Sequence, residues 1–268
     1  MIDAPFVQIE LTTVCNLKCF YCAGRSMPQR HMDRALFDAI LNRLPKQRLR
    51  VSLQGEGEPF MHPQIWEFIE AVMARGHEPY TITNGTIVRY PERVASSFPQ
   101  IGISIDTLDE EVARKVGRGE VKLALRGLDR LLKHMRPRRI IVHTVNFGQP
   151  MHELRDYVRA LGCQHQIQPL QQKEDYSRVY PDRASKISNN GTHCHLVATR
   201  RMRYFNIEGI EMPCAFIKDA GQYRGIEWIR ECFRADQVPN CCTGCRMLVP
   251  KPKSARAGTL RSTAERAN

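Results

Sequence analysis

The sequence of 268 residues has no long hydrophobic run and no secretory signal. Although 42% of its residues are hydrophobic, no stretch approaches the roughly 18 consecutive apolar residues that a membrane-spanning helix needs. Residues 1–5 contain neither the basic nor the apolar segment of a signal peptide. These absences argue against a membrane or secreted protein, and we expect a cytoplasmic one.

Cysteine, by contrast, is abundant, with ten residues. Thiols stay reduced in a reducing compartment, so clustered cysteines there indicate metal or redox ligands rather than disulfides. Apart from a lone Cys163, they form two groups. The first is Cys15, Cys19 and Cys22, and the second is Cys194, Cys214, Cys232, Cys241, Cys242 and Cys245. This distribution predicts two metal sites.

The formal net charge is +12, of which the tail, residues 250–268, carries +4. The tail has no apolar periodicity, and we expect it to be disordered. The remaining positive charge is spread along the chain, which is typical of a solvated basic surface. We therefore do not expect a nucleic-acid partner.

From residue 6 to about 170, short strand-like runs alternate with helical stretches. The expected strands are 6–11, 49–53, 79–83, 101–105, 139–145 and 165–170, and the expected helices are 33–44, 65–74, 92–98, 121–135 and 151–161. This alternation predicts an α/β fold with a mostly parallel sheet. The periodicity leaves an open sheet and a barrel as alternatives, and in both, ligands bind at the carboxyl ends of the strands.

The chain after residue 170 has a different character. A polar linker, 171–192, precedes a predicted hairpin of 203–207 and 211–214, a short helix over 226–233 and a tight turn at 241–245. Its apolar content is too low for an independent core, so we expect a metal to stabilise it. We therefore divide the chain into a core (1–170), a linker (171–192), a small cysteine domain (193–249) and a basic tail (250–268).

The first three cysteines have the spacing C-x3-C-x2-C in the loop after the first strand. Three thiolates on one loop can bind three irons of a cubane and leave the fourth iron open. A structural zinc site is the alternative, but it needs a fourth ligand, and His31 is the only nearby candidate.

This spacing, with the aromatic Tyr21 before the last cysteine, resembles the signature of the radical S-adenosylmethionine (SAM) superfamily. The resemblance implies a partial (β/α)6 barrel in which the open iron of a [4Fe–4S] cluster chelates SAM. It also implies that the reduced cluster cleaves SAM to a 5′-deoxyadenosyl radical, with a reductase such as flavodoxin or ferredoxin as partner.

Further motifs follow the next strands in the order that this family requires. Residues 54–59 resemble its GGEP element, with Glu56 in place of a glycine, residues 83–85 resemble its TNG turn, and a polar pair lies in the fourth strand. Arg118 is the expected partner of the SAM carboxylate. The SAM-contacting residues that the resemblance implies are Tyr21, Gly55, Glu56, Gly57, Glu58, Pro59, Thr83, Asn84, Gly85, Ser104 and Asp106.

The C-terminal cysteines resemble the start of a SPASM domain and match its shorter relative, the twitch domain. No cysteine follows Cys245, whereas a full SPASM domain continues with more. The resemblance implies one auxiliary [4Fe–4S] cluster on a small hairpin-and-knuckle domain, with the ligands Cys194, Cys214, Cys242 and Cys245. Cys241 and Cys232 compete for these positions, and a zinc knuckle fits the same pattern.

A fully ligated auxiliary cluster can accept an electron from a substrate radical, which makes the reaction a two-electron oxidation. About five residues precede the first strand, so we expect no N-terminal peptide-recognition domain. We therefore expect dehydrogenation of a small hydroxylated or amino-sugar-like molecule. The first alternative is a maturase that cross-links or epimerises a ribosomally made peptide, and the remote one is a zinc-knuckle protein that binds nucleic acid. No catalytic base is assigned.

Overall fold

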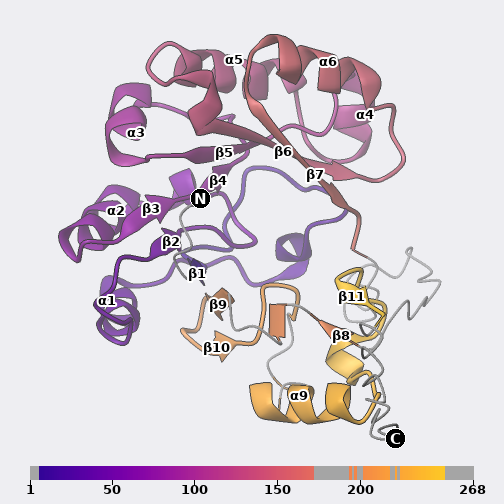
Figure 1. Ribbon diagram of the computed structural model, residues 1–268. Coiled ribbons are helices and arrows are strands. Elements are labelled where there is room, and N and C mark those ends of the chain that lie inside the picture. Colours follow the sequence, from indigo (N-terminus) through magenta and orange to yellow (C-terminus); the bar gives the residue numbers. More distant parts are fainter. Residues whose placement is uncertain are drawn as a thin grey trace, which may run out of the picture.

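The structure is a computed structural model that describes residues 6–171, 193–194, 196–197, 202–217, 221 and 224–250. The predicted linker and basic tail lie outside the described residues, except for residues 171 and 250 at their ends. Strands and helices alternate through the N-terminal part (Figure 1). The strands are β1 (Phe6–Ile9), β2 (Arg50–Ser52), β3 (Glu78–Tyr80), β4 (Ile82–Thr83), β5 (Ile101–Ser104), β6 (Ile140–Asn146) and β7 (Gln164–Pro169). The α-helices are α1 (Arg34–Asn42), α2 (Ile65–Ala74), α3 (Pro91–Ser97), α4 (Glu110–Lys115), α5 (Val121–Leu132) and α6 (His152–Ala160), and short 3-10 turns are η1 (Ala23–Ser26), η2 (Pro59–Met61) and η3 (Pro137–Arg139).

The five helices that the sequence predicts are present as α1, α2, α3, α5 and α6, whereas α4 was not predicted. The side chain of Asp33 accepts a hydrogen bond from the backbone N–H of Leu36 (2.8 Å) and so caps the start of α1. The inner face of α1 buries Phe37, whose ring stacks on Phe68 of α2 with a centroid distance of 4.4 Å. The apolar stripe of α1 therefore packs against α2.

The predicted α/β fold with parallel strands is confirmed. β1, β2 and β3 are parallel neighbours, as are β4, β5, β6 and β7. The expected strand 79–83 is split at Thr81, whose carbonyl accepts a hydrogen bond from the N–H of Gly102 (2.8 Å). The helices lie along the outer side of this curved set of strands in Figure 1. The outermost described strands, β7 and β10, do not pair, so the arrangement is an open, partial barrel.

The C-terminal region contains short elements around a second, smaller core. They are β8 (His193–Cys194), β9 (Met202–Phe205), β10 (Glu211–Met212), α9 (Ile226–Arg234), η5 (Asn240–Cys242) and β11 (Leu248–Val249). The predicted hairpin is present as the antiparallel pair β9–β10. β9 also pairs in parallel with β1, from Phe6 opposite Met202 to Ile9 opposite Phe205. The C-terminal region thus extends the sheet of the barrel, which the sequence did not indicate.

Within the described part of the chain, the helices are all too short or too polar to cross a lipid bilayer.

Candidate functional site

The first cysteine loop lies against the segment that follows α4. The N–H of Lys18 donates to the carbonyl of Gly117 (3.1 Å), and the N–H of Phe20 donates to the carbonyl of Val116 (3.0 Å). These two bonds fix the middle of the loop from residues about 100 positions away in the sequence. Long-range contacts therefore add to the loop's own short-range hydrogen bonds, such as that from the N–H of Cys22 to the carbonyl of Cys19 (3.1 Å).

The three thiols of this loop face three different segments. The Sγ of Cys15 lies 3.9 Å from the amide nitrogen of Asn84. The Sγ of Cys22 lies 3.4 Å from both the carbonyl oxygen and a carboxylate oxygen of Glu56, and the Sγ of Cys19 lies 3.7 Å from the carbonyl of Gly117. The loop thus places each thiol beside the carboxyl end of a different strand or the turn after α4.

Burial raises the pKa of the Cys15 and Cys22 thiols in the metal-free chain. For Cys22 the carboxylate of Glu56 raises the pKa further. Thiolates are the form that binds metal, so a metal must displace protons from these two side chains. Metal affinity at this loop should therefore rise with pH.

Glu58 joins two of the motifs that the sequence singled out. Its buried carboxylate accepts hydrogen bonds from the hydroxyl of Thr83 (2.8 Å) and the N–H of Asn84 (2.6 Å). Burial raises its pKa, while these hydrogen bonds act in the opposite direction. Pro59 begins η2, and Gly85 donates its N–H to the hydroxyl of Thr83 (3.1 Å). Residues 54–59 and 83–85 therefore form one layer above the strand ends.

Gly57 shows why this layer needs a glycine. Its N–H donates to the carbonyl of Thr12 (3.0 Å). A Cβ at Gly57 would lie 2.5 Å from that same carbonyl and 2.6 Å from the carbonyl of Val14. Any side chain would push the loop away from the chain leading to the cysteines.

Asp106 is the centre of a buried polar cluster beside the cysteine loop. Its carboxylate accepts hydrogen bonds from the hydroxyl of Tyr21, the Nε of Arg118 (2.6 Å) and the N–H of Val145 (2.8 Å). Burial raises the pKa of Tyr21. Burial alone would lower the pKa of Arg118, but the charges of its neighbours, Asp106 foremost, raise it. The structure therefore pairs Arg118 with Asp106, an interaction that the sequence analysis did not foresee.

A cavity adjoins this cluster between the ends of β4 and β5 and the helices α4 and α5. Asn84, Ser104 and Asp106, three of the predicted SAM-contacting residues, line it together with Arg118 and Leu17 of the cysteine loop. The remaining predicted residues of segments 54–59 and 83–85 lie in the layer held by Glu58. The predicted N-terminal set is thus brought to one end of the barrel.

The C-terminal cysteines line a second cavity. Cys194, Cys214, Cys242 and Cys245, the four predicted ligands, all border it. Cys241 borders it as well, with its Sγ 4.0 Å from that of Cys242. Cys232, the other competitor, lies on α9 and is absent from the lining among the described residues.

In the described ranges, no three His, Cys, Asp or Glu side chains are grouped to hold a single metal ion. This geometry concerns one ion bound by several ligands. A cubane instead presents a separate iron to each thiolate.

Asn16 is a residue of the site that the sequence analysis missed. Its side-chain oxygen Oδ1 accepts from the side-chain amide of Asn84 (2.9 Å), and its side-chain Nδ2 donates to the hydroxyl of Thr86 (2.8 Å). It therefore ties the cysteine loop directly to the turn at 83–85. The available signal was an amide side chain next to the first cysteine, which is weak because asparagine is common in loops.

Residues 9–161 match the profile of the family described as the Radical SAM superfamily. Among curated relatives, a probable GTP 3',8-cyclase of Methanococcus aeolicus is 25% identical over 60% of this chain and 58% of its own length. The mycofactocin maturase MftC of Mycobacterium ulcerans is 32% identical over 48% of this chain and 37% of its own length. The chain thus spans about half the length of the curated relatives it matches.

Solved structures share the fold over most of the chain. Streptococcus suis SuiB bound to S-adenosylmethionine gives a TM-score of 0.65 at 15% identity, covering 87% of this chain and 65% of that one. SuiB bound to its precursor peptide SuiA gives 0.63 at 16% identity, covering 84% and 64%. At these identities the likeness concerns the fold.

Proposed function

Because the chain belongs to the radical SAM superfamily, we propose that Cys15, Cys19 and Cys22 hold the [4Fe–4S] cluster at which SAM binds. The observation that carries this proposal is the placement of three thiols, on one loop, beside the motif layer at the strand ends. Thiolates are the ligands that iron–sulfur clusters take, and three of them leave one iron free. The donor set therefore fits the group.

When bound, the cluster supplies the electron that cleaves SAM, and the chain's own residues position the ligand. Asn84, Ser104 and Asp106 border the cavity next to the loop and would hold SAM. Glu58 keeps the segment 54–59 against the turn at 83–85. The burial of Asp106 and Cys19 limits the access of water to this part of the site.

The C-terminal cysteines are proposed to hold a second [4Fe–4S] cluster of the twitch type, with Cys194, Cys214, Cys242 and Cys245 as ligands. Their position around one cavity supports this assignment. Cys241 shares the lining and stays a competitor for Cys242. Soft thiolates also bind zinc, although the described residues contain no group of three such side chains placed around one ion. An assay of bound iron, sulfide and zinc separates the two.

The proposed reaction is hydrogen abstraction from a substrate, followed by transfer of the substrate radical's electron to the second cluster. The substrate loses a hydrogen atom to the 5′-deoxyadenosyl radical, an electron to the cluster and a proton to solvent or a base, so it is oxidised by two electrons. This is the chemistry of an oxidoreductase. A small hydroxylated or amino-sugar-like molecule is the first candidate substrate, and a reductase such as flavodoxin or ferredoxin is the proposed electron donor.

Modification of a ribosomally made peptide is the second candidate. The names of the relatives favour it, because MftC is a maturase and SuiB binds a precursor peptide. The cyclase among the relatives acts on a nucleotide, as its name states, so the family likeness alone does not select a substrate class.

The Cys15→Ala/Cys19→Ala/Cys22→Ala variant tests the first part of the proposal. We expect reductive cleavage of SAM to 5′-deoxyadenosine to disappear, because no thiolate remains to hold the cluster. The matched control is Cys163→Ala, which removes a thiol outside both groups and should leave cleavage unchanged. Cleavage at the wild-type rate in the triple variant would refute the assignment.

A further inference from the structure

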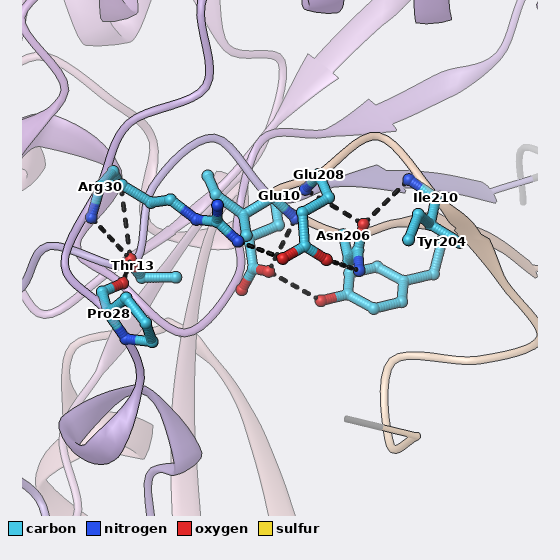
Figure 2. Close-up of polar contacts among 9 residues, drawn as sticks. Glu10, Thr13, Pro28, Arg30, Tyr204, Asn206, Glu208 and Ile210 are labelled. Carbon is cyan, nitrogen blue, oxygen red and sulfur yellow. Dashed lines mark hydrogen bonds and ion pairs between the residues drawn. The ribbon is translucent and has the colours of Figure 1, made fainter. Parts of the chain in front are cut away.

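Glu10 lies at the end of β1, five residues before the first cysteine, and its side chain is fully buried. One carboxylate oxygen accepts a hydrogen bond from the N–H of Glu56 (2.7 Å). The other accepts from the hydroxyl of Tyr204 (3.2 Å) and the N–H of Ile207 (3.1 Å). Figure 2 shows the contact between Glu10 and Tyr204, beneath the turn of the C-terminal hairpin. One carboxylate thus serves two parts of the chain that are about 150 residues apart.

The surrounding backbone fixes Glu10 in this position. Its own N–H donates to the carbonyl of Phe205 (2.9 Å), which continues the β1–β9 pairing by one residue. On the other side, a Cβ at Gly55 would lie 2.3 Å from the Cγ of Glu10. The glycine therefore allows the loop 54–58 to close directly over this side chain.

Each end of the Glu10 contact leads to a different cysteine group. The ring of Tyr204 is buried in the small core that also contains Cys194, Cys214 and Cys242. In the other direction, the carboxylate of Glu56 accepts from the N–H of Gly24 (3.2 Å) and lies beside the thiol of Cys22. A continuous series of contacts therefore joins the two cysteine groups through Glu10.

We propose that Glu10 is a positioning residue that couples the C-terminal cysteine region to the loop 54–58 beside Cys22. A displacement of the hairpin moves the two donors, the hydroxyl of Tyr204 and the N–H of Ile207, away from the Glu10 carboxylate. The carboxylate then shifts relative to the N–H of Glu56, which it also accepts from. Buried hydrogen-bond networks with shared members respond as a unit. The consequence for SAM affinity rests on the proposed function, whereas the consequence for the loop does not.

The same two regions are joined by an exposed contact that provides a control. Arg30, which follows the cysteine loop, forms an ion pair with Glu208 in the β9–β10 turn (Figure 2). Their side chains are 46% and 47% exposed. Exposed pairs of this kind contribute little because water and salt screen them. Glu208→Gln therefore removes a link between the two regions without removing the coupling.

Hydrogen–deuterium exchange of the full chain tests the positioning role without any activity. Glu10→Gln keeps the shape of the side chain, but only one of its two terminal atoms can accept, so either the bond from Glu56 or the bonds from Tyr204 and Ile207 are lost. We expect the Glu56 amide to exchange at least about fivefold faster, which is the lower end of typical coupling between sites. Tyr204→Phe should show a smaller increase, and Glu208→Gln should show none. Unchanged exchange at Glu56 in Glu10→Gln, at a retained unfolding midpoint, would overturn the proposal.

A double-mutant cycle on SAM affinity tests the coupling itself. In the iron-loaded protein, Cys242→Ser/Cys245→Ser should weaken SAM binding at least about fivefold in the wild-type background and have little effect in the Glu10→Gln background. Effects that simply add in the combined variant would overturn the coupling while leaving SAM binding intact. If the wild-type protein binds no SAM, the proposed function fails, and the exchange experiment alone decides the role of Glu10.

Discussion

The two cysteine regions differ in what holds them in place. The N-terminal loop is held by hydrogen bonds from residues 116–117 and lies beside Glu56 and Asn84, so long-range contacts with the barrel domain position it. In the C-terminal region, four of the eleven residues of the buried cluster are cysteines, namely Cys194, Cys214, Cys241 and Cys242. The larger core has none among its buried members.

From this difference we predict that the N-terminal loop would bind its proposed cluster as a preformed site, whereas the C-terminal region would depend on its proposed cluster to fold. A thiol is a small apolar group, so its burial stabilises the fold only slightly. In a small core, the free energy gained by burial exceeds the entropic cost of ordering the chain by little. Metal ligation would cross-link these side chains, so the free energy of metal binding would contribute directly to the free energy of folding. The comparison predicts that removal of metal affects the two regions unequally.

The largest expected effect is therefore that of metal removal. Chelation of the anaerobic protein should expose residues 224–250 to proteolysis and rapid hydrogen exchange, while the strands and helices of residues 6–170 stay protected. The reason is that β1–β7 and their helices have an apolar core of their own. Peptide-resolved exchange before and after chelation measures this. Equal loss of protection in both regions would contradict the comparison.

A second test addresses how firmly the barrel holds its loop. The buried carboxylate of Asp106 pairs with Arg118 and accepts hydrogen bonds from Tyr21 and Val145. Asp106→Asn removes its negative charge. Removing one member of such a buried pair costs about 3–5 kcal/mol in the free energy of unfolding. Denaturant unfolding measures the loss, and Asp156→Asn, which removes one member of the exposed Arg159–Asp156 pair, serves as the control. A loss below about 1 kcal/mol would show that this cluster does not support the site.

Local features of this structure could be predicted from the sequence, and long-range ones could not. Helix α2 spans Ile65–Ala74, as the apolar spacing and the glycine after its end predict, and the β9–β10 hairpin follows from its turn. The pairing of β9 with β1 was missed because residues 6 and 202 carry no local pattern that points to each other. Helix α4 was missed because it is short and mostly polar.

The candidate site shows the same division. The cysteine spacing and the motifs at 54–59 and 83–85 could be recognised from the sequence, and the structure brings them to one end of the barrel. The pairing of Arg118 with Asp106 and the contacts of Glu10 could not be predicted. Each depends on a partner supplied by another strand or by the C-terminal hairpin, and a charged residue gives no signal of its partner in advance.

The smallest expected effect is on the pH dependence of stability, through His143 in the interior of the barrel. Burial lowers the pKa of His143 to about 4, and its Nε2 bonds the hydroxyl of Tyr80 (2.8 Å). The unfolded chain binds this proton more readily, so stability is full above about pH 6.5 and is lost as pH falls towards 4. In the metal-free protein, the unfolding midpoint should fall when the pH is lowered from 6.5 to 4.5, and His143→Gln should make this fall smaller. The control is His152→Gln, since the side chain of His152 is 75% exposed. An unchanged pH slope in His143→Gln would show that His143 does not carry this dependence.

The claim that the barrel builds a SAM-binding cluster site by itself is tested most directly by EPR spectroscopy of the Cys242→Ser/Cys245→Ser variant. After anaerobic loading and reduction, this variant should hold about four irons, those of one cubane, and its spectrum should change when SAM is added. A variant that holds no cluster, or whose spectrum SAM leaves unaltered, would contradict the account.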